Sequence, residues 1–181
     1  MNTIKLNLLI FTLFLSVQMM GQKKTLYDFK ATTIDGEEFD FSTLKGKKVL
    51  IVNIATECSL APQLKKLQEL YEEYGGEDFE IIEFPSNDFG NKEPGESAEI
   101  KEVCTNKYAI TFPIMEKIMI KGDNPHPIFK WLTSSDENGT LDSKVTWNYQ
   151  KFLIDENGEV VDSFSPISSP KSNRILEWLM E

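Results

Sequence analysis

Two cysteines and a few nitrogen-bearing side chains are the residues best suited to chemistry in this sequence. Cys58 stands in "VNIATECSLAPQLKKL", between an apolar run that predicts a buried strand and a segment with helical periodicity. At the tip of a strand, just before a helix N-terminus, backbone N–H groups and the helix dipole favour a thiolate, which is nucleophilic at neutral pH. Position alone therefore makes Cys58 a candidate nucleophile, with an inert buried cysteine as the alternative.

The elements that must position Cys58 follow from periodicity and turn residues. An N-terminal hairpin is predicted to turn at Asp35-Gly36. The runs "KVLIVNIA" and "FEIIEFPS" predict strands buried on both faces, and the helix between them is expected to start at Pro62 and to end at Gly75. A strand–helix–strand order implies parallel pairing with a right-handed crossover.

The second half of the sequence completes the fold. A helix is expected over residues 97–108, which include Cys104, and "NPHPIFKWLT" predicts the start of another. "KFLIDENGEVVDSF" predicts a hairpin that turns at Asn157-Gly158, and "SPKSNRILEWLME" predicts a closing helix. This order predicts an α/β, thioredoxin-like fold: a central mixed sheet flanked by helices, with an N-terminal hairpin and an insertion before the final ββα.

The first residues have a different character. Residues 1–21 contain a single charged residue, Lys5, followed by "LNLLIFTLFLSV", an apolar core too short to span a bilayer. This layout is typical of a secretory signal peptide, and an uncleaved membrane anchor is the alternative. We therefore expect a signal peptide over residues 1–21, a single domain over residues 22–181, and export to the periplasm or the extracellular space without stable membrane insertion.

Charge and composition exclude several classes of function. The formal net charge is −10, and loss of Lys5 with the signal peptide would make it one unit more negative. Such an acidic chain without a basic cluster is a poor candidate for binding nucleic acid or anionic membranes. The two cysteines and the single histidine, His126, form no short-spaced ligand cluster, so no metal and no other cofactor is expected. His126 stands at a predicted helix start, which favours a structural role.

Five segments resemble, in order, the motifs of the glutathione peroxidase family. They are "NIATECSLAPQ", "FPSNDFGNKEPGE", "ITFPIMEKI", "NPHPIFKWL" and "WNYQKFLIDENGEVV". The resemblance covers roughly residues 25–181. It implies a thioredoxin-like fold and the reduction of hydroperoxides by a selenocysteine or a cysteine. The family's reactive position falls on Cys58, so this chain resembles the cysteine-containing form.

The family also places a glutamine, a tryptophan and an asparagine around the reactive sulfur. Trp147 and Asn148 match in "TWNYQKF", and the resemblance implies that their N–H groups stabilise a thiolate and orient a peroxide oxygen. For Trp147, simple packing under the loop is the alternative. The glutamine position falls on Lys92, whose charge would favour a thiolate unless the side chain points into solvent. Ser59, where the family usually has glycine, is a second departure.

Cys104, in "EVCTNKYAITFP", matches the resolving cysteine of thioredoxin-dependent members. The resemblance implies that Cys58 reduces a peroxide and becomes a sulfenic acid, with which Cys104 condenses to a disulfide. A thioredoxin-like protein or glutathione would then reduce that disulfide. If Cys104 lies on a helix, the helix must partly unwind, because a disulfide tolerates only Cα separations below about 7 Å. A permanent structural Cys58–Cys104 disulfide is the alternative in an exported protein.

Two other functions remain open on the sequence. A thiol–disulfide exchange protein would fit the fold, although the chain has no C-x-x-C pair. A non-catalytic, disulfide-stapled binding module would fit the departure at Lys92. Between Lys117 and Trp147 the chain lacks the longer insertion of tetrameric animal members, so we expect a monomer or a weak dimer. The leading prediction is an exported thiol peroxidase that uses a thioredoxin-like reductant.

Overall fold

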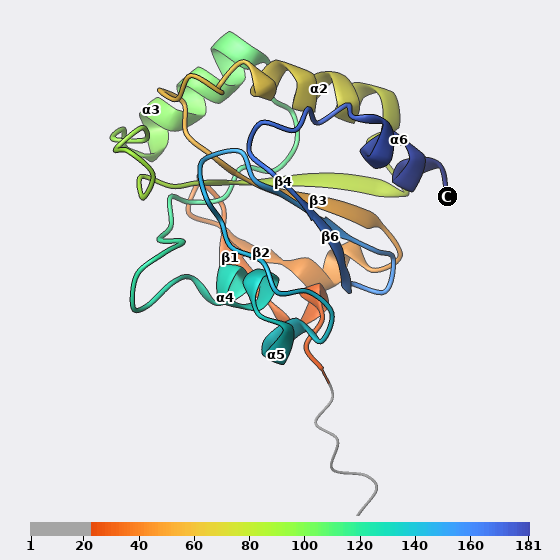
Figure 1. Cartoon of the computed structure of the whole chain (residues 1–181). Helices are drawn as coiled ribbons and strands as arrows, with labels where there is room; N and C mark the ends of the chain where they lie inside the picture. Colours follow the sequence, from red (N-terminus) through yellow and green to blue (C-terminus); the bar gives the residue numbers. More distant parts are fainter. Residues whose placement is uncertain (1–22) are drawn as a thin grey trace, which may run out of the picture.

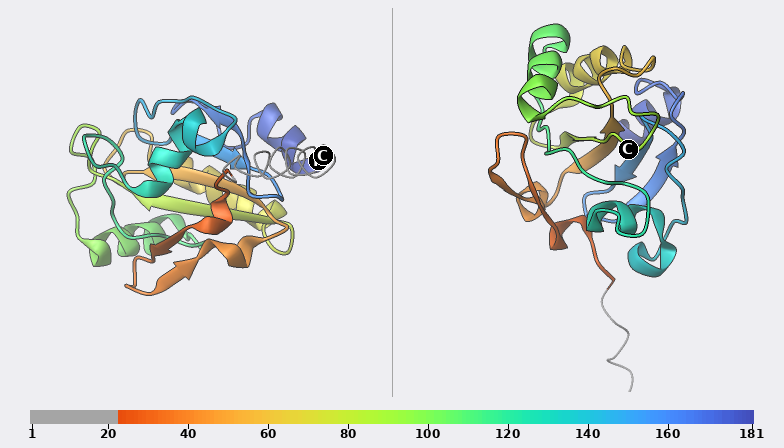
Figure 2. Two further views of the ribbon diagram at one scale, coloured as in Figure 1. Left: turned by 90° about the horizontal axis from the view of Figure 1, so that it is seen from below. Right: turned by 90° about the vertical axis from the view of Figure 1, so that its left-hand side faces the viewer.

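The computed structural model describes residues 23–181 of the chain. The predicted signal peptide, residues 1–21, lies outside the described residues, and its prediction therefore stays a prediction. No helix within the described part is both long and apolar enough to cross a bilayer. Figure 1 shows a central sheet with helices on both of its faces, and the right-hand view of Figure 2 shows the same layers from the side.

The sheet has four strands in the order β4-β3-β5-β6, with β3 at Lys48–Ile54, β4 at Phe79–Pro85, β5 at Lys151–Ile154 and β6 at Val160–Phe164. Strands β3 and β4 are parallel, whereas β5 is antiparallel to both β3 and β6. The predicted mixed sheet is confirmed. Because β5 is antiparallel to β3, the start of β5 lies beside the end of β3, where Cys58 follows.

A two-stranded hairpin precedes the sheet, with β1 at Lys30–Thr32 and β2 at Glu38–Asp40. It turns where predicted, and Gly36 supplies the positive φ of 83° that the turn needs. Short 3₁₀ turns flank the hairpin: η2 at Leu26–Asp28 and η3 at Phe41–Leu44. The buried leucines and phenylalanines of these turns belong to the core on one face of the sheet.

Three helical segments cover the face that carries both cysteines. They are α2 at Gln63–Tyr74, α3 at Ser97–Glu102 with the π-helical turn η4 at Val103–Lys107, and α6 at Asn173–Met180. The core on this face holds residues from β3, β4, α2, α3 and α6, among them Leu50, Val52, Ile81, Leu64, Leu67, Ile100 and Ile175. Figure 1 shows these helices together on one side of the sheet.

The opposite face is covered by the predicted insertion, which forms α4 at Pro127–Thr133 and the short α5 at Ser135–Asn138. His126 caps α4, since its Nδ1 accepts a hydrogen bond from the Ile128 N–H at 3.4 Å. The predicted structural role of His126 is therefore confirmed. A second core lies between α4, the N-terminal turns and the sheet, with Phe41, Ile51, Phe84, Phe129 and Phe152 among its members.

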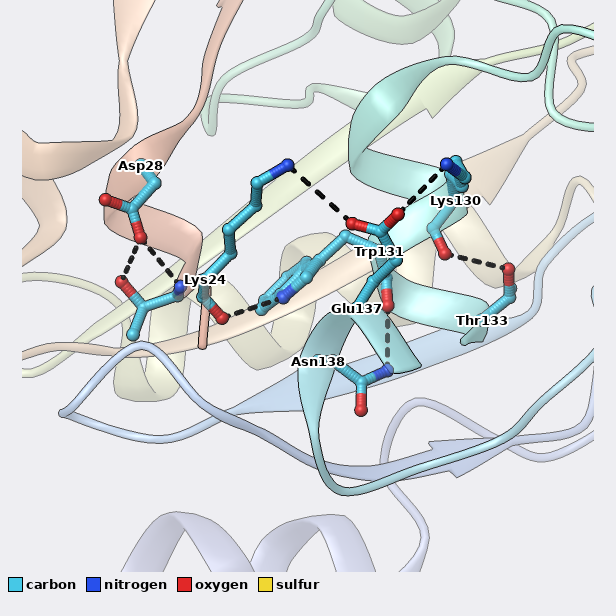
Figure 3. A network of polar contacts seen from close by, with 8 residues as sticks. Lys24, Asp28, Lys130, Trp131, Thr133, Glu137 and Asn138 are labelled. Carbon is cyan, nitrogen blue, oxygen red and sulfur yellow. Dashed lines mark hydrogen bonds and ion pairs between the residues drawn. The ribbon is translucent and has the colours of Figure 1, made fainter. Parts of the chain in front are cut away.

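The first described residues are fastened to α4 and α5 by the polar contacts of Figure 3. The indole N–H of Trp131 donates to the Lys24 carbonyl at 2.9 Å, and the amide of Asn138 donates to the Trp131 carbonyl at 2.7 Å. The Glu137 carboxylate lies 3.7 Å from the Lys24 ammonium and 2.9 Å from that of Lys130. These bonds tie the insertion to the N-terminal segment, on the face away from the cysteines.

One local expectation needs correction. Residues 97–108 do not form one continuous α-helix: α3 ends at Glu102, and the chain continues as a π-helical turn that contains Cys104. The helix after Cys58 begins where it was expected: α2 starts at Gln63, directly after Pro62. A run of turns therefore separates α2 from Cys58, with bonds of the i→i+3 type such as Ala61 N–H to the Cys58 carbonyl at 2.9 Å.

Candidate active site

Cys58 lies in the turns that connect β3 to α2, and its side chain is almost fully buried, with 6% of its surface exposed. The Leu60 N–H donates to its Sγ at 3.4 Å. We expected the N-terminus of the following helix to stabilise a Cys58 thiolate. Helix α2, however, begins only at Gln63, and a helix dipole acts mainly within the first turn, so α2 does not do this alone. The turn itself instead directs a backbone N–H at the sulfur.

The Cys58 turn is fastened to the loop that follows β4. The buried Glu93 carboxylate accepts from the Thr56 backbone N–H at 2.6 Å and from the Thr56 hydroxyl at 2.7 Å. The Glu57 N–H donates to the Lys92 carbonyl at 3.0 Å. Burial raises the pKa of Glu93, and the hydrogen bonds from Thr56 lower it in part. This two-point attachment fixes the position of the Cys58 backbone.

The backbone of Lys92 lies beside the Cys58 turn, because its carbonyl accepts the hydrogen bond from the Glu57 N–H. Its side chain is exposed and forms no ion pair with any described residue. The neighbouring Gly90, with φ of 73°, lies under the Trp147 ring, where an added Cβ would come within 3.0 Å of the indole. The structure therefore places Lys92 near the site without directing its ammonium at Cys58.

Trp147 and Asn148 lie in the turn before β5, at the edge of the sheet where β3 ends. Trp147 is 41% exposed and packs edge-on against Phe89, with ring centroids 6.2 Å apart. Asn148 is fully buried; its Nδ2 donates to the Phe89 carbonyl at 3.1 Å, while its Oδ1 has no hydrogen-bond partner within residues 23–181. The two side chains are brought to the Cys58 region, and neither donates directly to Sγ.

Tyr149 joins this turn to the Cys58 turn. It is fully buried with φ of 74°, its N–H donates to the Asn53 carbonyl at 2.6 Å, and its hydroxyl donates to the Ala55 carbonyl at 2.8 Å. A positive φ in a bulky residue is strained and persists only where surrounding contacts fix it. Tyr149 thus holds the Trp147–Asn148 turn against the end of β3.

Cys104 is fully buried in the same core cluster as Cys58, and both are free thiols. The structure gives no support to the alternative of a permanent Cys58–Cys104 disulfide. Burial raises the pKa of Cys104 far above its ordinary range, and the carboxyls of Glu83 and Glu93 raise it further. In this position Cys104 is a protonated, unreactive thiol.

A cleft of about 450 Å³ separates the two cysteine-bearing segments. Thr56 and Glu57 line it from the Cys58 turn, Glu93 from the loop, and Val103 and Lys107 from the π-helical turn around Cys104. Among residues 23–181, no group of three or more acidic, histidine or cysteine side chains could hold a metal ion.

Comparison with known proteins decides what kind of site this is. The model of the glutathione peroxidase family matches residues 26–133. The glutathione peroxidase homolog BsaA of Staphylococcus epidermidis is 44% identical over 148 residues, which are 82% of this chain and 93% of that protein. The chain belongs to the glutathione peroxidase family. As a member of this family it is a peroxidase, an oxidoreductase that acts through a thiol.

Three further similarities place this glutathione peroxidase within the family and the fold. The glutathione peroxidase-like peroxiredoxin 2 of Saccharomyces cerevisiae is 45% identical over 149 residues, 82% of this chain and 91% of the yeast protein. The solved structure of Trgpx in its apo form covers 88% of this chain with a TM-score of 0.68 and 31% identity. A thiol:disulfide interchange protein of the thioredoxin family from Chlorobium tepidum, with a TM-score of 0.59 and 20% identity, shows the predicted thioredoxin-like fold.

Three residues of the site were missed at the sequence level. Glu93 directly follows Lys92 in "FGNKEPG", and its place in that motif was the available signal. Tyr149 directly follows Asn148, but its strained backbone leaves no mark in the sequence. Glu83 interrupts the apolar run "FEIIEFPS", and a charge within a buried strand was a signal that periodicity alone passed over.

Proposed function

We propose that this peroxidase reduces hydrogen peroxide or organic hydroperoxides through Cys58, with Cys104 as its resolving cysteine. The observation that carries this proposal is the placement of both cysteines, as free thiols, in one core cluster on one face of the sheet. The similarity to the glutathione peroxidase-like peroxiredoxin 2 of Saccharomyces cerevisiae supports the same assignment.

In the oxidation step the Cys58 thiolate attacks the terminal peroxide oxygen. A sulfur–oxygen bond forms, the O–O bond breaks, and the alkoxide or hydroxide that leaves takes up a proton. The Leu60 N–H stabilises negative charge on Sγ. Trp147 and Asn148 lie where they would bound the approach of the peroxide, and the second amide N–H of Asn148 is the donor we assign to the developing oxygen charge.

In the resolving step Cys104 attacks the Cys58 sulfenic acid, and water leaves. Cys104 must first move, because it is held as a buried thiol with a strongly raised pKa. The π-helical turn favours this movement, since π-helical geometry within α-helices is rare and often marks functional sites. The adjoining cleft provides the space.

For the remaining properties we propose an exported protein, periplasmic or extracellular, that works as a monomer or a weak dimer. A thioredoxin-like protein, rather than glutathione, is the reductant we favour, because a Cys58–Cys104 disulfide is a natural substrate for dithiol exchange. Lys92 is assigned a secondary part at most, because its side chain is exposed.

The test is peroxide turnover with reduced thioredoxin and, separately, with glutathione. Cys58→Ser should abolish turnover, because the nucleophile is lost. Cys104→Ser should consume about one equivalent of peroxide and then stop, with a sulfenic acid that a dimedone-type reagent traps. Unchanged steady-state turnover of Cys104→Ser would refute the resolving role, and residual turnover of Cys58→Ser above the uncatalysed rate would place the active site elsewhere.

A further inference from the structure

Glu83, on β4, is a buried carboxyl that the mechanism above does not use. It has no exposed surface, and neither of its carboxyl oxygens has a hydrogen-bond partner within residues 23–181. Its backbone, by contrast, is satisfied: its N–H donates to the Pro113 carbonyl at 3.2 Å, and its carbonyl accepts from Met115 at 2.9 Å. A buried polar group without a partner is costly, so its presence calls for an explanation.

The Glu83 side chain lies on the same face of the sheet as the two cysteines. Strand β4 alternates, and Phe79 and Ile81 on this face belong to the core cluster that contains Cys58 and Cys104. The titratable groups that face Glu83 are the Cys104 thiol from η4, the Glu93 carboxyl from the loop after β4, and the Tyr149 hydroxyl from the turn before β5. None of these groups is a cation, so none of them would balance the negative charge of an ionised Glu83.

Burial therefore raises the pKa of Glu83 to about 8; the adjacent Cys104 thiol lowers it in part, and the Glu93 carboxyl raises it. At neutral pH the group is predominantly a neutral carboxylic acid. Cys104 is protonated for the same reasons, since burial and the nearby Glu83 raise its pKa. In the reduced protein, therefore, the Cys104 sulfur and the neighbouring Glu83 carboxyl each carry a proton.

We propose that Glu83 couples the resolving step to the release of one proton. Its neutral carboxyl faces the Cys104 thiol of the π-helical turn, and it releases its proton when Cys104 leaves to join Cys58. This inference rests on the proposed function, because it requires a disulfide between the two cysteines.

The Cys104 sulfur bonds to the Cys58 sulfur, the S–O bond of the sulfenic acid breaks, and the Cys104 proton with the departing hydroxide makes water. In the same transition Glu83 gives one proton to solvent and becomes a carboxylate. Reduction by a dithiol returns Cys104 to its place, and Glu83 takes up one proton again.

Movement of Cys104 accounts for this change in protonation. With both cysteines reduced, Glu83 has no exposed surface and the Cys104 thiol is its neighbour, whereas a disulfide requires the Cys104 Cα to come within about 7 Å of that of Cys58. The cleft lined by Glu93 and Val103 adjoins the position that Cys104 leaves. Water can then reach the carboxyl, and hydration returns its pKa toward the ordinary range.

The test is the equilibrium between the protein and dithiothreitol, measured at pH 6 and at pH 7. Both couples exchange two thiol protons for two electrons, so their equilibrium constant does not change with pH unless another group releases a proton. If Glu83 releases one proton on oxidation, the constant for oxidising the wild-type protein rises about tenfold from pH 6 to pH 7. In Glu83→Gln the constant should stay unchanged within a factor of about two, because the amide has no proton to release.

Glu80→Gln is the matched control, because Glu80 is a second buried carboxyl on β4 whose pKa burial also raises, and the side chains that act on it are Tyr71 and Lys47 rather than a cysteine. This variant should keep the wild-type tenfold change. A wild-type constant that does not change between the two pH values would overturn the inference without any variant, as would a tenfold change that persists in Glu83→Gln. If peptide mass analysis finds no Cys58–Cys104 disulfide after peroxide, the proposed function itself fails, and the role of Glu83 fails with it.

Discussion

Glu83 should make the stability of the reduced protein depend on pH, and the effect can be predicted from its burial. Burial raises its pKa to about 8 in the folded protein, whereas the unfolded chain gives it the ordinary value of 4.5. A carboxyl with a raised folded pKa adds stability that is fully present below pH 4.5 and is lost as the pH rises through about 8. The loss arises because the folded state cannot easily release the proton that the unfolded chain releases.

The size of this effect follows from the pKa of Glu83 in the unfolded and in the folded protein. One pKa unit corresponds to about 1.4 kcal/mol, so raising the Glu83 pKa from 4.5 to about 8 removes roughly 2.5 kcal/mol of unfolding free energy between about pH 5 and pH 7. Glu83→Gln keeps the shape of the side chain but cannot ionise. The difference in stability between the variant and wild type should therefore move by that amount, in favour of the variant, as the pH rises.

The assay is denaturant unfolding of both proteins, kept reduced, at pH 5, 6 and 7 with linear extrapolation. The quantity that tests the reasoning is the difference between wild type and Glu83→Gln, because a carboxyl such as Glu80, whose pKa is also raised, contributes to both proteins alike. A difference that stays constant within about 0.5 kcal/mol over this range would refute the neutral, buried carboxyl. So would a difference that moves in the opposite direction.

Three further predictions concern the geometry around Cys58. Trp147→Phe with Asn148→Ala should slow oxidation of Cys58 in stopped-flow measurements, since each well-placed donor to developing charge contributes roughly 2–4 kcal/mol; rates close to wild type would mean that both residues only pack. Thr56→Val should lower the unfolding free energy by about 1.5–3 kcal/mol, because the buried Glu93 carboxylate loses the hydroxyl bond of 2.7 Å, and an unchanged denaturation midpoint would contradict this. Lys92→Gln should change the oxidation rate less than about tenfold, because its exposed ammonium is screened by solvent and salt; a larger loss that disappears at high salt would show that its charge activates Cys58.

The sequence by itself determined the elements and their order. The continuous apolar run over 48–54 predicted β3, and Asn157-Gly158 predicted the turn between β5 and β6. The helical periodicity after Pro62 predicted α2, which ends at Gly75 as expected. These features depend on neighbouring residues, because backbone propensity and the alternation of apolar side chains act over a few positions of the chain.

Only the tertiary structure decided which groups face one another. Glu93 reaches Thr56 across 37 positions, and Tyr149 reaches Ala55 across 94. Nothing near Glu83 in the sequence shows that its carboxyl faces Cys104, because that contact depends on the register of β4 and on the π-helical turn. Burial and long-range contacts set the protonation of such groups, and both arise only when segments distant in the chain pack together.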